Sequence, residues 1–176
     1  MRVQPDAVFV PLNIAVLTVS DTRTYDNDTS GELLASRSVE VGHRLVARAL
    51  LKDDLYKIRA QVATWIADEQ VQVVLITGGT GFTGRDSTPE AVECLLDKRI
   101  AGFGARFGAL AILSIGTSTV QSRGLAGLTG ACRTGWEGIL AEQLDARHRP
   151  CNFVKHLTPV RVMSGRSNDC HHQIYI

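Results

Sequence analysis

Residues 71–91 read VQVVLITGGTGFTGRDSTPEA, and this stretch decides the fold. Its first part, Val71 to Ile76, is a short apolar and mostly β-branched run, which is typical of a strand buried on both faces of a parallel sheet. The run ends in a loop with four glycines, and a helix start follows with Thr88 as N-cap and Pro89 at the first helical position. A strand, a glycine loop and a helix N-terminus in this order predict a site that binds phosphate.

Two familiar nucleotide motifs match this loop only in part. Gly79, Gly81 and Gly84 spell the dinucleotide fingerprint G-x-G-x-x-G, but in that motif the helix has begun by the third glycine, whereas here it begins later. A dinucleotide oxidoreductase also needs an acid about 20 residues beyond the loop, at the end of the next strand, and Asp97 falls within the predicted helix. A P-loop would need Gly-Lys-Ser/Thr. An ordinary turn is disfavoured because it rarely needs so many glycines beside a charged pair such as Arg85-Asp86.

Composition favours one globular domain without a strongly charged partner. The chain has 176 residues, 44% of them apolar and 21% charged, with a formal net charge of +1. This charge gives no reason to expect nucleic acid or a membrane surface as partner. No run of 18 apolar residues and no apolar leader occurs, so we expect a cytoplasmic protein. The four cysteines are too widely spaced for a C-x-x-C motif, and we expect no zinc site.

Two further strands are predicted before the glycine loop. Asn13 to Val19 is a β-branched run that reads as the first buried strand, and residues 43–51 alternate in the pattern of an edge strand. Ser20-Asp21 follows the first strand, at the carboxyl edge where open α/β sheets bind ligands. These two side chains could equally cap a turn.

Two helices are predicted between these strands. Thr29 to Glu32 forms a capping box, which starts a helix that should end near Gly42. A second helix has its apolar residues at amphipathic spacing and begins after Asp53-Asp54. The two acids could simply favour the helix dipole. If Asp53 instead faces the same crevice as Asp86, the two carboxylates would be natural ligands for Mg²⁺. The apolar residues of the second helix are Ile58, Val62, Trp65 and Ile66.

The remainder of the chain gives weaker signals. The helix begun at Pro89 should run to about Asp97, residues 101–104 read as a connection, and residues 105–113 could be a helix or a strand. Arg123 could hold an anion or lie in a solvated loop. A last helix is predicted over residues 136–144, and residues 158–176 have the composition of a polar tail.

Several segments together resemble the MoaB/MogA family of molybdenum cofactor biosynthesis, whose fold also forms the G domain of gephyrin. The most specific is TGGTG…RDSTPEA in residues 77–91, and the similarity covers residues 9–157. QLDARHRPCNF at residues 143–153 is closer to the MoaB branch than to MogA. The other matching segments are VLTVSD at 16–21, DTSGELL at 28–34, IRAQV at 58–62, IGTSTVQSR at 115–123 and ACRTGWE at 131–137.

The resemblance implies a three-layer α/β/α fold with a mostly parallel sheet, commonly assembled as a homotrimer or homohexamer. It also implies a reaction, in which the terminal phosphate of molybdopterin is joined to the α-phosphate of Mg-ATP and pyrophosphate is released. By the same resemblance Asp86 and Asp53 would be the catalytic residues and would hold Mg²⁺. The residues that would bind pterin and phosphate are Ser20, Gly78, Gly79, Thr80, Gly81, Ser122 and Arg123.

The chain departs from the family pattern after Ser122-Arg123. The family continues with a sheet strand and a Pro-Gly-Ser-type loop, whereas here Ala126-Gly127-Leu128 runs almost directly into Thr129-Gly130-Ala131, so that by comparison with the family a dozen or so residues are absent. A βαβ alternation also calls for a strand at this point. Either residues are missing, with the numbering closed over the gap, or the deletion is genuine. We expect one family-like domain over residues 1–157, with this gap near residues 128–129, and the polar tail over 158–176.

A second function within the same fold stays open. The chain could be a pterin-binding paralogue without catalytic activity, because Lys52 stands where the family frequently has proline and the end segments resemble the MoaB branch. A Rossmann-type oxidoreductase is the alternative from a different class, and Asp97 argues against it as described above.

Overall fold

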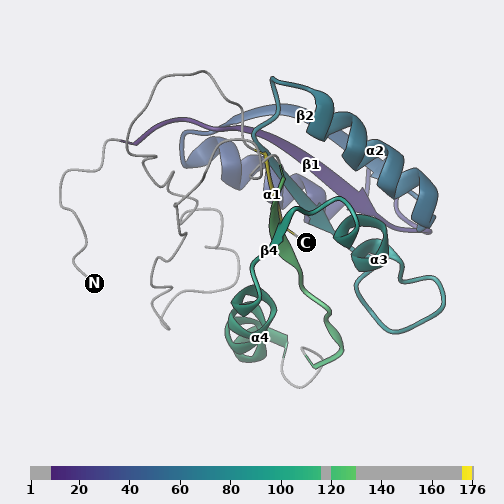
Figure 1. Ribbon diagram of the computed structural model, residues 1–176. Helices are drawn as coiled ribbons and strands as arrows, with labels where there is room; N and C mark the ends of the chain where they lie inside the picture. The colour runs from purple at the N-terminus through teal and green to yellow at the C-terminus, as the bar shows by residue number, and fades with distance from the viewer. Residues whose placement is uncertain (1–8, 116–119, 130–171, 176) are drawn as a thin grey trace.

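The computed structural model describes residues 9–115, 120–129 and 172–175. Within these ranges the chain folds into a six-stranded sheet with helices against both faces (Figure 1). The strands are β1 (Asn13–Val19), β2 (Arg44–Leu51), β3 (Val73–Thr77), β4 (Lys98–Arg99), β5 (Ala126–Thr129) and β6 (His172–Tyr175), and the helices are α1 (Thr29–Glu40), α2 (Leu55–Ala67), α3 (Thr88–Glu93) and α4 (Gly102–Ile115). The strand order is β2-β1-β3-β6-β5-β4.

The strands predicted from β-branched runs form the parallel part of the sheet. β1 pairs in parallel with β2 on one side and β3 on the other, and β2 is the edge strand that its alternation predicted. Successive side chains of a strand point to opposite faces. Leu17 of β1 therefore packs in one apolar cluster with Ile58 of α2, whereas Ile14 packs on the other face in a cluster with Ala35 of α1. The expected three-layer α/β/α fold with a mostly parallel sheet is confirmed.

The capping of α1 differs from the prediction. The N-cap is Asp28 rather than Thr29, and its Oδ1 accepts the backbone N–H of Gly31 at 2.9 Å. Its other oxygen, Oδ2, accepts the hydroxyl of Thr18 at 2.8 Å and an N–H of Arg48 at 2.9 Å. A carboxylate reaches all three donors, which a threonine hydroxyl could not, and α1 is thereby tied to both β1 and β2.

Helix α3 is shorter than predicted and begins differently. Ser87 occupies the N-cap position, and Thr88 is the first helical residue, with its hydroxyl donating to the carbonyl of Gly78 at 2.9 Å. The helix ends at Glu93 and does not reach Asp97, whose N–H donates to the carbonyl of Leu128 at 2.9 Å. Pairing with the neighbouring strand therefore takes the donor that a longer helix would have used.

Residues 101–104 were wrongly predicted as a connection, and the undecided stretch that follows is helical. α4 begins at Gly102, and Gly104 within it serves close packing and not a turn. A Cβ atom at Gly104 would lie 2.6 Å from the carbonyl oxygen of Gly124. Phe103 packs against the cluster that contains Ile14. Among the described helices, none is long and apolar enough to cross a membrane.

The remaining half of the sheet was not predicted. β6 lies between β3, to which it is parallel, and β5, to which it is antiparallel, and β4 pairs with β5 at the far edge. Residues 172–175 were expected in a tail outside the domain, and the structure instead places them in the middle of the sheet, beside β3. The rest of the 158–176 range and the helix predicted over 136–144 lie outside the described residues.

Candidate functional site

The candidate site lies where the carboxyl ends of β1, β2 and β3 meet. Ser20 follows β1 and its N–H donates to the carbonyl of Leu51 at 2.8 Å, which joins the ends of β1 and β2. Asp21 Oδ1 accepts the N–H of Asp53 at 3.3 Å and an N–H of Arg85 at 2.7 Å. Asp21, which follows β1, therefore links the end of β2 to the loop after β3. This role was missed from the sequence, which showed only that Asp21 follows a strand.

Two glycines of the loop are required by the backbone and by close contacts. Gly78 and Gly79 have φ angles of 98° and 63°, in the left-handed region that favours glycine. A Cβ atom at Gly78 would lie 2.0 Å from the carbonyl oxygen of Val19, and one at Gly79 would lie 2.6 Å from Oδ2 of Asp53. The loop can therefore approach the end of β1 and the Asp53 carboxylate only because these residues have no side chain.

Asp53 is bonded to the start of α3. Its Oδ1 accepts the backbone N–H of Ser87 at 3.1 Å and also the Ser87 hydroxyl. The Ser87 side chain accordingly makes no capping bond to its own helix. Asp53 thus holds the loop that carries Asp86 from the side of β2.

Asp86 is held within the glycine loop as a carboxylate. Its Oδ2 accepts the hydroxyl of Thr83 at 2.6 Å and the N–H of Thr83 at 2.8 Å. These hydrogen bonds, the hydroxyl first, lower the pKa of Asp86 below its ordinary value, with smaller contributions from the N–H of Gly81 and the charge of Arg123. Asp86 is therefore ionised at neutral pH, and it already uses some of the N–H groups that the sequence had assigned to phosphate binding.

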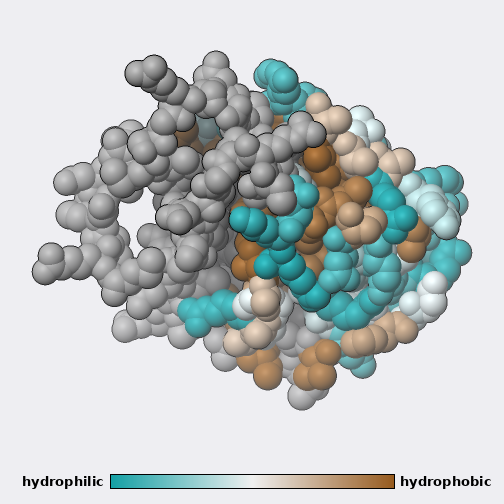
Figure 2. Space-filling view, in the orientation of Figure 1, coloured by the Kyte–Doolittle hydropathy of each residue, from teal (hydrophilic) through white to brown (hydrophobic). Residues whose placement is uncertain are grey.

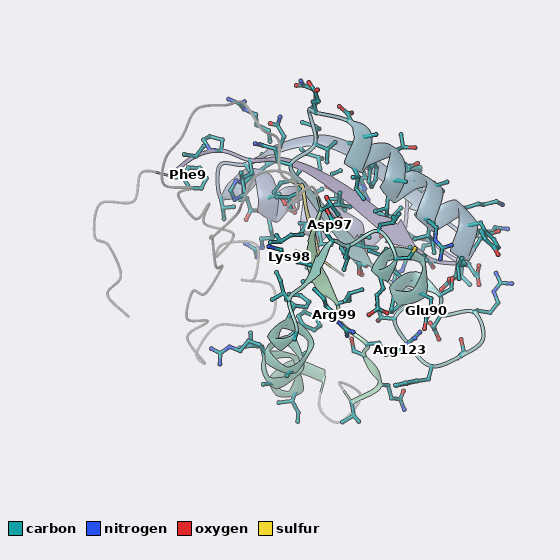
Figure 3. The ribbon with its side chains drawn as sticks, viewed as in Figure 1. Phe9, Glu90, Asp97, Lys98, Arg99 and Arg123 are labelled. Carbon is teal, nitrogen blue, oxygen red and sulfur yellow. The ribbon has the colours of Figure 1, made fainter. Side chains whose placement is uncertain are left out.

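Arg123 holds the glycine loop through hydrogen bonds on the side away from Asp53, and we call this contact the brace of the loop. Figure 3 shows its side chain and that of Glu90 in α3 pointing toward one another, and the two form an ion pair. This pairing lowers the pKa of Glu90 although burial acts to raise it. The guanidinium lies 5.5 Å from the centre of the Phe82 ring. Arg123 also donates to the carbonyls of Thr80 at 3.1 Å, Gly81 at 2.8 Å and Asp86 at 2.6 Å. Its side chain is thus bonded to the loop and not merely solvated, and it also lines one of the two hollows beside the loop.

Two open hollows flank the loop, and Gly84 and Ser87 line both of them. The first, which we call the arginine hollow, has a volume of about 340 Å³ and is lined by Phe82, Asp86, Glu90 and Arg123 among others. The second, the lysine hollow, has a volume of about 400 Å³ and is lined by Lys52, Asp53, Asp54, Lys57 and Arg85 among others. Figure 2 shows that hydrophilic residues cover much of the face around α3.

The structure brings the predicted residues together around this loop. Asp53 and Asp86 line different hollows on the two sides of Ser87, and Ser122-Arg123 lies against Thr80 through the Arg123 backbone. The Ser20 hydroxyl accepts the N–H of Arg23 at 3.2 Å, so it caps a turn, one of the two roles left open. Ser87 and Glu90 were missed, because the STPE run in which they occur was read only as a helix start.

The acidic groups here suit a cation that brings most of its own ligands. Among the described residues, no group of three or more His, Cys, Asp or Glu side chains comes together. Mg²⁺ is commonly held by one or two protein carboxylates together with substrate phosphates and water. Asp53 and Asp86 both contact the glycine loop but line different hollows, so each by itself supplies the one carboxylate that this requirement calls for.

The fold and the site together define an α/β protein with an anion-binding glycine loop at the carboxyl edge of a mostly parallel sheet. Residues 15–146 match the family described as "Probable molybdopterin binding domain". The chain belongs to this family.

Similar proteins place the chain in the MoaB branch, as the resemblance indicated. It is 51% identical over 166 residues to molybdenum cofactor biosynthesis protein B of Escherichia coli, covering 88% of this chain and 98% of that protein. The Bacillus cereus protein of the same name is 45% identical over 116 residues, covering 65% and 69% of the two chains.

Solved structures agree with this placement. A crystal structure of molybdenum cofactor biosynthesis protein B has a TM-score of 0.66 and 42% identity, over 70% of this chain and 77% of that one. The tungsten cofactor synthesizing protein MoaB from Pyrococcus furiosus has a TM-score of 0.59 and 32% identity, over 68% and 74% of the two chains. A MogA structure, at 24% identity and a TM-score of 0.61 over 67% and 78%, supports the fold alone.

Proposed function

We propose that this chain acts in molybdenum cofactor biosynthesis by binding molybdopterin at the glycine loop and joining its terminal phosphate to the AMP part of ATP. In this reaction a phosphate oxygen of the pterin attacks the α-phosphorus of ATP, and the bond to pyrophosphate breaks. The observation that carries the proposal is the position of Asp86. It is an ionised carboxylate that Thr83 fixes on the glycine loop, between the arginine hollow and the start of α3.

The arrangement suits nucleotidyl transfer because that chemistry depends on positioning and charge neutralisation rather than on a nucleophilic side chain. Lys52, Lys57 and Arg85 line the lysine hollow and provide positive charge for phosphate groups. The hydrogen bonds of Arg123 to the loop carbonyls keep the loop in one conformation. A fixed loop lowers the cost of aligning two substrates.

Asp86 and Asp53 are the residues proposed to hold the Mg²⁺ of Mg-ATP. The bound ion would offset the negative charge of the phosphates during transfer. Asp53 remains attached to Ser87 through one oxygen, Oδ1, which leaves Oδ2 facing Gly79. We also propose that the chain assembles as a homotrimer or homohexamer, as the resemblance implies. Analytical ultracentrifugation would measure the oligomeric state.

The test is an Asp86→Asn variant mixed with Mg-ATP and molybdopterin. Loss of the carboxylate charge should abolish most of the adenylylated product, by at least about 100-fold if electrostatic stabilisation is the main contribution. Glu40→Gln is the matched control, because Glu40 is an exposed acid at the far end of α1 and pairs with Arg37, one turn earlier in the same helix. Full activity in the Asp86→Asn variant would contradict the proposal.

A pterin-binding protein without transfer activity is the second candidate. It is favoured by Lys52, which lies in the lysine hollow at a position where the family frequently has proline. Binding of molybdopterin by the unaltered protein, with no adenylylated product in the presence of Mg-ATP, would select this alternative. A Rossmann-type oxidoreductase has no support, because Asp97 precedes the short antiparallel strand β4 instead of following a parallel strand.

A further inference from the structure

The two halves of the described sheet are joined through one short strand, β6. β3 pairs with β1 on one side and with β6 on the other, and β5 pairs with β6 and β4. Val73, Val74 and Leu75 of β3 face Gln173, Ile174 and Tyr175 in parallel register. Without β6, the described strands would separate into β2-β1-β3 and β5-β4. β6 is therefore the element on which the continuity of the sheet depends.

The strands on both sides of β6 have the burial of interior strands. Val73 and Val74 of β3 are buried, and so are Ala126 and Thr129 of β5. Buried backbone N–H and C=O groups need hydrogen-bond partners, because water cannot replace a missing strand in the interior. A vacant place between β3 and β5 would expose both backbones and much of this apolar surface.

The strand also has a direct geometric relation to the site. β3 runs into Gly78 of the glycine loop, and β5 begins shortly after Arg123, which braces that loop. Tyr175 is in register with Leu75 of β3 and with Ala126 of β5, at the end of β6 nearest these two features. The width of β6 therefore sets the separation between β3, which leads into the glycine loop, and β5, which follows Arg123.

We propose that residues 172–175 form a docked strand that closes the sheet within its own chain, and that this docking holds Arg123 against the glycine loop. The place between β3 and β5 is a strand-binding site of the β-augmentation type, in which the backbone of the added strand forms hydrogen bonds with β3 on one side and β5 on the other. A segment covalently linked to β5 fills it at a high effective concentration, which favours the same chain over a second copy.

The first test uses the unaltered protein and does not depend on the proposed function. Hydrogen exchange followed by mass spectrometry should show the peptide containing residues 172–175 protected on the order of 100-fold relative to the isolated peptide. Protection should be the same at low and high protein concentration. Exchange at the rate of the free peptide would overturn the proposal, and protection that falls on dilution would overturn docking within one chain by showing a strand from a second copy.

The second test asks whether the docked strand positions Arg123 against the glycine loop. Ile174→Pro removes a backbone donor from an interior strand, where proline is hardly tolerated, and Ile174→Val is the matched control that keeps a β-branched residue. We expect the proline variant to lose protection in peptides covering β5 and residues 120–125 while β1 and β2 keep theirs. Unchanged protection in residues 120–125 would overturn the positioning role. A proline variant that unfolds throughout, including β1, would overturn it too, and the exchange test above would still decide the docking.

A third measurement links this strand to the site, and it rests on the proposed function. If molybdopterin binds at the glycine loop, its affinity should fall about 10-fold or more in Ile174→Pro and not in Ile174→Val, because Arg123 would no longer be held against the loop. Failure of the unaltered protein to bind molybdopterin would count against the proposed function alone. Undiminished affinity in the proline variant would count against the positioning role.

Discussion

Asp28 and Asp86 are two carboxylates held by the same kinds of donors in very different surroundings. Each accepts a backbone N–H and a threonine hydroxyl, and each has an arginine nearby, Arg48 for Asp28 and Arg123 for Asp86. The Asp28 side chain is 0% exposed, whereas Asp86 lines the open arginine hollow. Burial therefore separates a carboxylate that stabilises the fold from one that can meet a ligand.

The bonds of the two carboxylates also connect different parts of the molecule. Asp28 uses Oδ1 for Gly31 of α1 and Oδ2 for Thr18 of β1 and Arg48 of β2, so three elements depend on it. Both bonds from Thr83 to Asp86 end on one oxygen, Oδ2, and stay within the loop. We therefore expect changes at Asp28 to affect stability and changes at Asp86 to affect ligand binding.

The largest effect on stability is expected for Asp28→Asn. An asparagine has one acceptor oxygen, so it can serve either Gly31 or the pair of Thr18 and Arg48, but not both. Breaking a buried ion pair costs about 3–5 kcal/mol, and we expect the lower end because the Arg48 side chain is 20% exposed. Urea unfolding monitored by circular dichroism measures the loss.

Asp26→Asn is the control for this prediction. Asp26 lies in the same loop, two positions before Asp28, but is exposed. Its replacement should change the free energy of unfolding by less than about 0.5 kcal/mol. Equal losses in the two variants would mean that burial does not distinguish the acids of this loop.

A smaller effect is expected for the coupling between Asp28 and Arg48. Arg48→Met keeps much of the side-chain volume and removes the charge, and among the described residues the Nε of Arg48 has no hydrogen-bond partner to lose. The double variant Asp28→Asn/Arg48→Met should be more stable than the sum of the single losses by about 2 kcal/mol, because no buried charge is left unpaired. Glu32, which also pairs with Arg48, is exposed and loses that partner equally in the single and the double Arg48→Met variants. A double-mutant cycle in urea measures this term. Simple additivity would contradict a direct pairing.

The pH dependence of stability should also distinguish Asp28. Burial raises the pKa of Asp28, but hydrogen bonds from Gly31, Arg48 and Thr18 outweigh it and hold the pKa below its ordinary value. A lowered folded-state pKa contributes stability that is present above the unfolded value, about 3.9, and is lost as the pH falls through the folded value. The stability gap between the unaltered protein and Asp28→Asn should thus be constant from neutral pH to about 5 and shrink below about 4. A gap that widens in acid would have the wrong sign.

The sequence predicted the elements with strong periodicity and missed those that depend on distant partners. β1, β3 and α2 have runs or stripes long enough to be recognised, and they form as predicted. β5 and β6 are four residues each, too short for a pattern, and their pairing joins segments far apart in the chain. Local signals cannot reveal such pairing.

The candidate site shows the same division. Asp86 and the glycines occur in one continuous motif, so their position followed from the sequence. Asp28 was passed over, because the hydroxyl of Thr29 next to it looked like the cap and the partner Arg48 belongs to another strand. The role of Arg123 was left open for a similar reason, since its partners in the loop lie some forty positions earlier in the sequence.

The smallest effect on stability is expected for Asp86→Asn. The amide oxygen of an asparagine can accept both Thr83 bonds, because they reach the same atom in the carboxylate, and the unfolding free energy should fall by at most about 1 kcal/mol. The same variant should lose most of the adenylylation activity proposed above. Urea unfolding and product formation measured on one preparation compare the two outcomes. A destabilisation as large as that of Asp28→Asn would show that Asp86 also supports the fold, and its half-buried position on the arginine hollow would then no longer separate binding from stability.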